Sequence, residues 1–523
     1  MPGRGHGKGP AQRREPRGPG VALSVAHILT LHLGTTACKA SLFTLGGEVA
    51  AQAATEYETV HPAPGWAEQD PEAWWEAALA GARRLPQDLR RTVCAVGLTS
   101  HRGGVVPMDG QGRPLARCII WMDRRSTAEV EALVRAFGRE RLHEVTGLIP
   151  DTESTAGKLL WLRSHAPEIF RAARLYLQPR DYLYFRLTGA PATDYTLASR
   201  TMLLDIGRRG WWDEGCAFVG VTPGVFPPIY PSAAAPHQLG ADAAGALGLP
   251  PGVPVALGAG DRPCGVLGSG AAAGWVTVST GTTTNVSAPV AGRPARVDRR
   301  VMCSLHAVDG MTVLEQGMSA SGAILRWMRD RLLGGRHDYR QLDALAADVP
   351  PGANGLQFLP FMMGARATRW NPAARGVWFG LTEAHGTGAL ARSILEGVAY
   401  ELRACLDVLE EMDVPVSGIL AVGGGARSTL WSRIFADVTG RPVRVPRQRD
   451  AASLGAMLLA ARAVGAIDRL EDAARSLNPV AATVVPDPGA TRRYRELYVQ
   501  YNRLYESLRP IFDELAAAGP GEE

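Results

Sequence analysis

Two short Gly-Thr turns, one in each half of the chain, carry the first residues suited to chemistry. Gly34-Thr35-Thr36 follows the strand-like run 26–32, and Gly281-Thr282-Thr283 follows the run 274–280. A glycine at a strand end lets backbone N–H groups approach phosphate oxygens, and threonine hydroxyls add donors. Either turn alone is also an ordinary hairpin connection, but the repetition favours a pair of phosphate-binding turns.

A third glycine-rich turn, Gly423-Gly424-Gly425, separates a predicted strand at 418–422 from a helix that starts near Ser428. Three glycines there leave space for a flat ring against the backbone, although a flexible strand-to-helix loop is the other interpretation. The chain has no Gly-x-x-x-x-Gly-Lys-Ser/Thr motif, which disfavours a P-loop nucleotide site.

Asp261 is the carboxylate best placed for catalysis. It follows the apolar run 253–257 and lies among glycines. A carboxylate in that setting is open to a substrate, where it could orient a hydroxyl or accept its proton during phosphoryl transfer. The alternative is that Asp261 caps the next helix.

The elements that must position these residues alternate between strands and helices, which indicates an α/β fold. Each Gly-Thr turn lies between two predicted strands, so the architecture reads as duplicated, with a junction near 249–254. Apolar residues recur at helical spacing over 390–409, and the aromatic-rich segment after about residue 485 predicts a helix packed onto one lobe.

Bulk composition excludes several classes of protein. The chain has 523 residues, 46% hydrophobic and 20% charged, with a net charge of +5. Most of the excess lies within residues 1–20, so nucleic acid is not an expected partner, and no apolar run is long enough for a membrane span. Seven scattered cysteines form neither a disulfide framework nor a zinc site, which favours a reduced, cytoplasmic protein.

Several further motifs resemble the FGGY carbohydrate kinases, the family of xylulokinase, glycerol kinase and ribulokinase. The resemblance covers about residues 26–463. It rests on segments 95–104, 120–125, 155–161, 181–189, 193–200, 358–361, 369–382 and 423–428.

The resemblance implies two actin-like, RNase-H-type lobes with an interlobe cleft. It implies Asp261 as the general base and as a substrate contact, with His101, Arg102 and Asp123 also at the sugar. ATP and its phosphates would lie at Gly34, Thr35, Thr36, Gly281, Thr282, Thr283, Gly424, Gly425, Ala426 and Ser428. A magnesium ion bridging the phosphates is expected.

Two positions depart from the family pattern. His32 stands where the family usually has an aspartate that organises magnesium, and imidazole is a poor magnesium ligand. Altered metal handling, a slow kinase and a non-catalytic sugar binder are the competing interpretations. The segment His101-Arg102-Gly103 matches neither glycerol kinases nor xylulokinases cleanly, and Asp123 could instead pair with Arg124 or Arg125.

The expected organisation has four parts. Residues 1–25 form a disordered basic extension, 26–250 a mainly sugar-binding lobe, 251–485 a mainly ATP-binding lobe, and 486–523 a helical segment. The expected acceptor is a ketopentose such as xylulose, with glycerol or another polyol or cyclitol as the alternative. A homodimer is the assembly considered for this chain.

Overall fold

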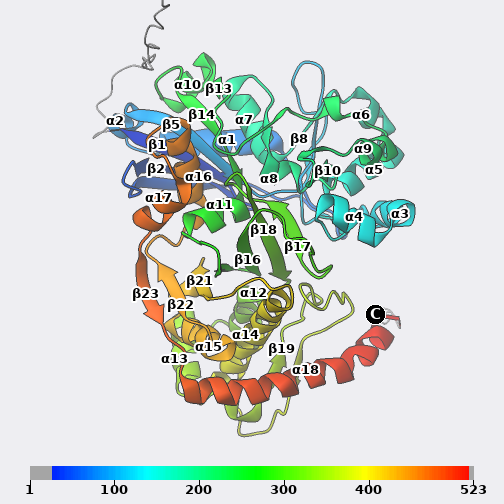
Figure 1. The fold of residues 1–523 in the computed structure, drawn as a ribbon, viewed down its shortest axis with the longest axis vertical. Helices are drawn as coiled ribbons and strands as arrows, with labels where there is room; N and C mark the ends of the chain where they lie inside the picture. Colours follow the sequence, from blue (N-terminus) through cyan, green and yellow to red (C-terminus); the bar gives the residue numbers. More distant parts are fainter. Residues whose placement is uncertain (1–25, 518–523) are drawn as a thin grey trace, which may run out of the picture.

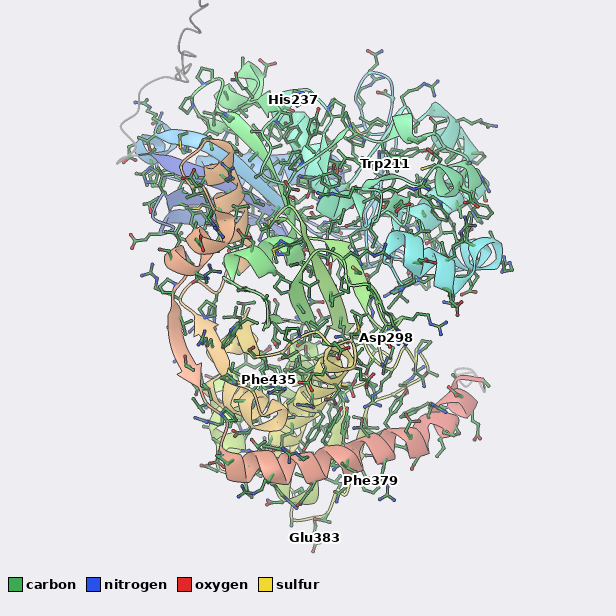
Figure 2. All side chains as sticks on the ribbon, viewed as in Figure 1. Trp211, His237, Asp298, Phe379, Glu383 and Phe435 are labelled. Atoms are coloured by element: carbon green, nitrogen blue, oxygen red, sulfur yellow. The ribbon has the colours of Figure 1, made fainter. Side chains whose placement is uncertain are left out.

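The computed structural model describes residues 26–517, which form two α/β lobes stacked along the long axis of the molecule (Figure 1). The lobes extend in opposite directions, with His237 at the outer end of the first and Glu383 at that of the second (Figure 2). The expected basic extension, 1–25, lies outside the described residues. None of the helices within 26–517 combines the length and apolar character needed to cross a bilayer.

The first lobe is built on a six-stranded sheet with the order β13-β14-β5-β1-β2-β3. Strands β1, β5 and β14 are parallel, and β1, β2 and β3 form an antiparallel meander. The bounds are β1 His27–Leu33, β2 Ala37–Thr44, β3 Val49–Glu56, β5 Val93–Ser100, β13 His237–Gln238 and β14 Pro254–Gly260.

The second lobe repeats this pattern in a seven-stranded sheet with the order β17-β18-β16-β15-β21-β22-β23. Again a hairpin, β15-β16, is followed by parallel neighbours, β21 and β22. The bounds are β15 Trp275–Thr280, β16 Thr284–Ala291, β17 Met302–Leu305, β18 Met311–Met318, β21 Gly418–Val422, β22 Val443–Pro446 and β23 Val480–Val484. The predicted duplication and the two-lobed fold are therefore confirmed.

Alternation along β1 divides its side chains between two helical layers. Leu29 and Leu31 point to one face, covered by α1 (Pro71–Arg83), while Ile28 points to the other face. Because successive side chains in a strand point to opposite faces, His32 shares the face of Ile28. That face is covered by α16 (Ala451–Ala463), which lies beside the first sheet although its sequence follows the second (Figure 1).

Close backbone contact fixes α16 against α11 (Asp261–Gly268). A Cβ atom on Gly268 would lie 1.9 Å from the Ala451 carbonyl oxygen, and one on Gly455 would lie 2.0 Å from that of Cys264. Only glycine allows the two helices to approach so closely. The second sheet shares its hydrophobic core with three helices: α14 (Thr387–Glu411), α15 (Thr429–Thr439) and the long α18 (Pro488–Ala517).

The path of the chain differs from a simple two-part division. The junction expected at 250/251 falls just before β14, which pairs with β5 of the first sheet, and the chain enters the second sheet only after α11. It returns to the first lobe between β22 and α16, and crosses again between α17 (Leu470–Leu477) and β23. Three crossings therefore connect the lobes, because α16 supplies the apolar cover that the first sheet requires.

Candidate functional site

Three segments of the first lobe converge because parallel strands end at the same edge of a sheet. The Gly34 turn follows β1, His101 follows β5, and Asp261 follows β14. The His101 backbone N–H donates to the Leu33 carbonyl at 3.0 Å, which ties the first two segments together. Ser100 is the register partner of Gly260, which places the third beside them.

The second lobe brings its glycine turns together in the same way. Gly281 follows β15, and Gly423 follows the parallel neighbour β21. Gly423 has a φ of +79°, and a Cβ atom there would lie 2.8 Å from the Thr280 carbonyl oxygen. The turn thus needs glycine both for its backbone conformation and for its close approach to β15.

A cavity of about 230 Å³ lies between these two edges. His32 and Asp261 face it from the first lobe, Ser279 and Gly423 from the second, and Asp450 from the crossing before α16. The duplicated sheets thus present their carboxyl-end turns to a shared interlobe space, which is where open α/β folds bind ligands.

Asp261 has the geometry of an available carboxylate. Its Oδ1 atom accepts the Arg262 backbone N–H at 2.8 Å and lies 3.8 Å from Nε of Arg102. Its Oδ2 atom accepts no hydrogen bond from any residue within 26–517. The N-cap of α11 is Gly260, without a side-chain hydrogen bond, so the capping alternative does not describe this aspartate.

His32 meets a carboxylate that the sequence prediction missed. Its Nδ1 atom lies 4.0 Å from Oδ1 of Asp450, and Oδ2 of Asp450 lies 2.8 Å from Nζ of Lys39. Burial lowers the pKa of His32 despite the nearby carboxylate. At neutral pH the ring is therefore uncharged, and Asp450 is the nearby fixed negative charge.

His101 is buried, and neither ring nitrogen has a hydrogen-bond partner within the described residues. Burial lowers the pKa of His101 to about 4, so the ring is neutral at physiological pH. The His101 and Trp74 rings pack edge to face. A neutral imidazole has one donor and one acceptor, and no described residue uses either one, although His101 is not among the residues that line the interlobe cavity.

Arg102 is occupied by a buried ion pair that joins the lobes. Its guanidinium donates twice to Glu315 of β18, at 3.1 and 2.6 Å, and Arg262 approaches the same carboxylate at 3.3 Å. Burial alone would raise the pKa of Glu315, but the guanidiniums outweigh it and hold that pKa well below its usual range. Arg200 and Arg366 hold Glu153, another buried carboxylate, at 2.8 Å each.

Asp123 lies apart from the interlobe cavity. Its side chain has no exposed surface, and its oxygens accept from the Ala67 backbone at 2.6 Å and from Arg125 at 2.8 Å. The Arg125 guanidinium also covers Trp66, 3.7 Å from the ring centre. Asp123 thus pairs with Arg125, which is the alternative to a sugar contact that the sequence left open.

A larger cavity of about 870 Å³ opens in the second lobe beside the glycine turns. It brings together five residues expected at a nucleotide, namely Gly281, Thr282, Gly424, Gly425 and Ser428. Ser428 also caps α15 by accepting the Trp431 N–H at 2.9 Å. One wall of this cavity is apolar and consists of Leu325, Tyr339 and Trp431. Four arginines add positive charge: Arg326, Arg340, Arg427 and Arg449.

The other predicted phosphate residues lie at the turns themselves. Thr35 accepts a hydrogen bond from Trp121 at 3.2 Å, and Thr36 is exposed. The Gly281 backbone N–H donates to the Thr283 carbonyl at 2.8 Å and closes the turn, while Ala426, which follows the glycine triplet, is buried.

Comparison with known proteins decides the family. Models of the N-terminal and C-terminal domains of the FGGY family of carbohydrate kinases match residues 27–268 and 276–464. The chain belongs to this family. It is therefore a carbohydrate kinase, as the motifs predicted.

FGGY relatives cover nearly the whole chain but act on different sugars by name. The chain is 33% identical to xylulose kinase from Escherichia coli, over 92% of this chain and 99% of that protein. It is 29% identical to gluconokinase from Bacillus licheniformis, over 94% and 98%. The crystal structure of xylulose kinase from Rhodospirillum rubrum superimposes with a TM-score of 0.85 at 30% identity, covering 93% of this chain and all of that one.

Within this FGGY kinase, the sequence prediction missed Arg449 and Asp450, which line the interlobe cavity, and the buried Glu315, which pairs with Arg102. Asp450 had a readable local signal, since an aspartate before a helical run is a favoured N-cap, and its side chain does accept the Ser453 N–H. Glu315 had none, because it is one residue of a buried strand. Its role depends on Arg102, which is 213 positions away.

Proposed function

We propose that this kinase transfers the γ-phosphate of ATP to a hydroxyl of a ketopentose such as xylulose, with Asp261 as the general base. The observation that carries the proposal is the free Oδ2 of Asp261 in a cavity between the two glycine-turn edges. The relative named xylulose kinase that spans almost the whole chain supports this acceptor.

The larger cavity suits ATP chemically. Its volume lies within the range usual for small-molecule sites. Its arginines outnumber its two aspartates, Asp338 and Asp343, which favours a polyanion. The apolar wall would contact the base, and the backbone N–H groups of the glycine turns would meet the phosphates.

In the proposed reaction, Asp261 accepts the proton of the acceptor hydroxyl as that oxygen attacks the terminal phosphorus. The bond from this phosphorus to the bridging oxygen breaks, and ADP leaves. A positioned general base contributes about 10²–10⁴-fold to rate. The unpartnered nitrogens of His101 would orient the acceptor through its other hydroxyls. The Arg102–Glu315 pair would hold the lobes closed, so that the sugar rather than water receives the phosphoryl group.

Magnesium fits the interlobe cavity only if protein and nucleotide oxygens coordinate it together. Among residues 26–517 no group of three or more His, Cys, Asp or Glu side chains could hold a metal. Magnesium in kinases commonly uses one or two carboxylates together with phosphate oxygens and water, and Asp261 and Asp450 line the cavity. When bound, the ion would neutralise phosphate charge.

We also propose a cytoplasmic location.

An ADP-release assay tests the proposal. The panel contains xylulose, ribulose, glycerol, a cyclitol and gluconate, each with magnesium or manganese. We expect the highest kcat/KM with xylulose. A higher value with glycerol or the cyclitol would replace the acceptor by the polyol alternative, and a preference for gluconate would replace it by a sugar acid. Binding of sugar and nucleotide without turnover under either metal would overturn the proposed reaction.

A further inference from the structure

Arg449 occupies a position that no other arginine of the cleft shares. It lines both the interlobe cavity that holds Asp261 and the larger cavity beside the glycine turns. In a transfer reaction the phosphoryl group must pass from one of these spaces to the other. Arg449 therefore lies at the point where the donor site and the acceptor site meet.

The side chain of Arg449 is exposed, and no residue within 26–517 forms an ion pair or hydrogen bond with its guanidinium. The other cations near the acceptor side already have carboxylate partners. Lys39 is held by Asp450 at 2.8 Å, and Arg102 and Arg262 share Glu315. Arg449 lines both cavities, and its guanidinium has no carboxylate partner within the described residues.

The backbone on both sides of Arg449 is fixed. The preceding Gln448 N–H donates to Asn478 Oδ1 at 2.7 Å. The following Asp450 accepts from Lys39 and from the Ser453 hydroxyl at 2.9 Å. The anchored backbone fixes the base of this side chain, so only the side-chain torsions of Arg449 have to be ordered when its guanidinium meets an anion.

The surroundings of Arg449 also favour an anion. Ala451 and Ala452, at the N-terminus of the 13-residue helix α16, line the same cavity. The positive end of the helix dipole adds to the guanidinium charge there. Residues 447–450 connect the second sheet to α16 of the first lobe, so Arg449 belongs to one of the interlobe crossings and its place depends on both lobes.

From these observations we infer that Arg449 is a catalytic residue that contacts the terminal phosphate of the bound nucleotide and stabilises its negative charge during transfer. The inference rests on the proposed function, since it takes ATP as the phosphate donor. A bidentate guanidinium suits this task, because its planar donors match two phosphate oxygens and its charge is permanent.

The test compares Arg449→Ala and Arg449→Lys with Arg447→Ala as a matched control. Arg447 is exposed and lies two residues earlier, but it lines neither cavity. We expect Arg449→Ala to lower kcat about 10²–10³-fold, the scale seen when one preorganised donor is removed. Arg449→Lys should recover part of this loss, and Arg447→Ala should stay within twofold of the wild type.

A binding measurement separates this inference from the proposed acceptor. Calorimetry with a non-hydrolysable ATP analogue and with adenosine needs no sugar, so it remains informative if no sugar of the panel is phosphorylated. We expect Arg449→Ala to weaken the analogue about tenfold, as loss of a charge-assisted hydrogen bond does, and to leave adenosine unchanged. Equal weakening of both ligands, or no weakening of either, would overturn the assignment.

Discussion

Arg102 of the first lobe and Glu315 of the second form a buried ion pair, with Nη2 and Oε2 2.6 Å apart. The same guanidinium approaches Asp261, with Nε 3.8 Å from Oδ1. One residue therefore links lobe contact to the position of the proposed base. Substitution of Glu315 tests the contact between the lobes, and substitution of Asp261 tests the proposed base.

Asp261→Asn should reduce kcat by about 10²–10⁴-fold, because the amide cannot accept the hydroxyl proton. The KM for ATP should change little, since Asp261 lies outside the larger cavity. Steady-state ADP release measures both constants. Asp468→Asn, at an exposed position, is the control. A variant as fast as the wild type would remove Asp261 from the chemistry.

Glu315→Gln should destabilise the protein by about 3–5 kcal/mol at pH 7, because it leaves Arg102 buried without its counter-charge. Denaturant unfolding measures this, with the exposed Glu140→Gln expected within about 1 kcal/mol of the wild type. The folded pKa of Glu315 is depressed, so its contribution is complete above the unfolded value of about 4.3 and is lost at lower pH. The difference between the two proteins should therefore shrink below about pH 4, and a constant difference would contradict this account.

His101→Gln should flatten the pH dependence of stability between about pH 6.5 and pH 4. The folded pKa of His101 is lowered to about 4, so in this interval the unfolded chain binds a proton that the folded protein excludes. Stability of the wild type therefore falls as the pH falls through this interval. Unfolding midpoints at several pH values measure the slope. An unchanged slope would mean that His101 contributes nothing to it.

His32→Asp should raise the affinity for magnesium several-fold, since it adds a hard oxygen ligand beside Asp450. Titration of ADP binding at several magnesium concentrations gives this affinity without turnover. His32→Asn provides the uncharged control. If metal dependence is the same in all three proteins, the metal is bound away from residue 32.

Local patterns predicted most of the fold, because each strand and each glycine turn is encoded within a few neighbouring residues. The position of Asp261 after a strand was also readable, and the shared carboxyl edge of β1, β5 and β14 explains why it meets the Gly34 turn. The return of α16 to the first sheet was not predicted. It depends on which sheet needs an apolar cover, and nothing in the segment 451–463 itself states that.

The return of α16 to the first lobe also explains why the sequence prediction considered His32 without Asp450. From sequence, residue 32 appeared as a position that had lost its carboxylate. In the folded chain Asp450 stands 4.0 Å away, brought there by α16. Contacts between residues hundreds of positions apart follow from the packing of whole layers, and single-sequence periodicity does not specify such packing.

The triple crossing of the chain limits how this protein can be divided. A fragment that ends at residue 268 would contain every strand of the first sheet but would lack α16, leaving Ile28, Ala95 and Ala256 facing water. The complementary fragment would carry an orphan apolar helix between β22 and β23. Neither half is a self-sufficient folding unit, so the cleft cannot be reconstructed from separately purified lobes cut at that boundary.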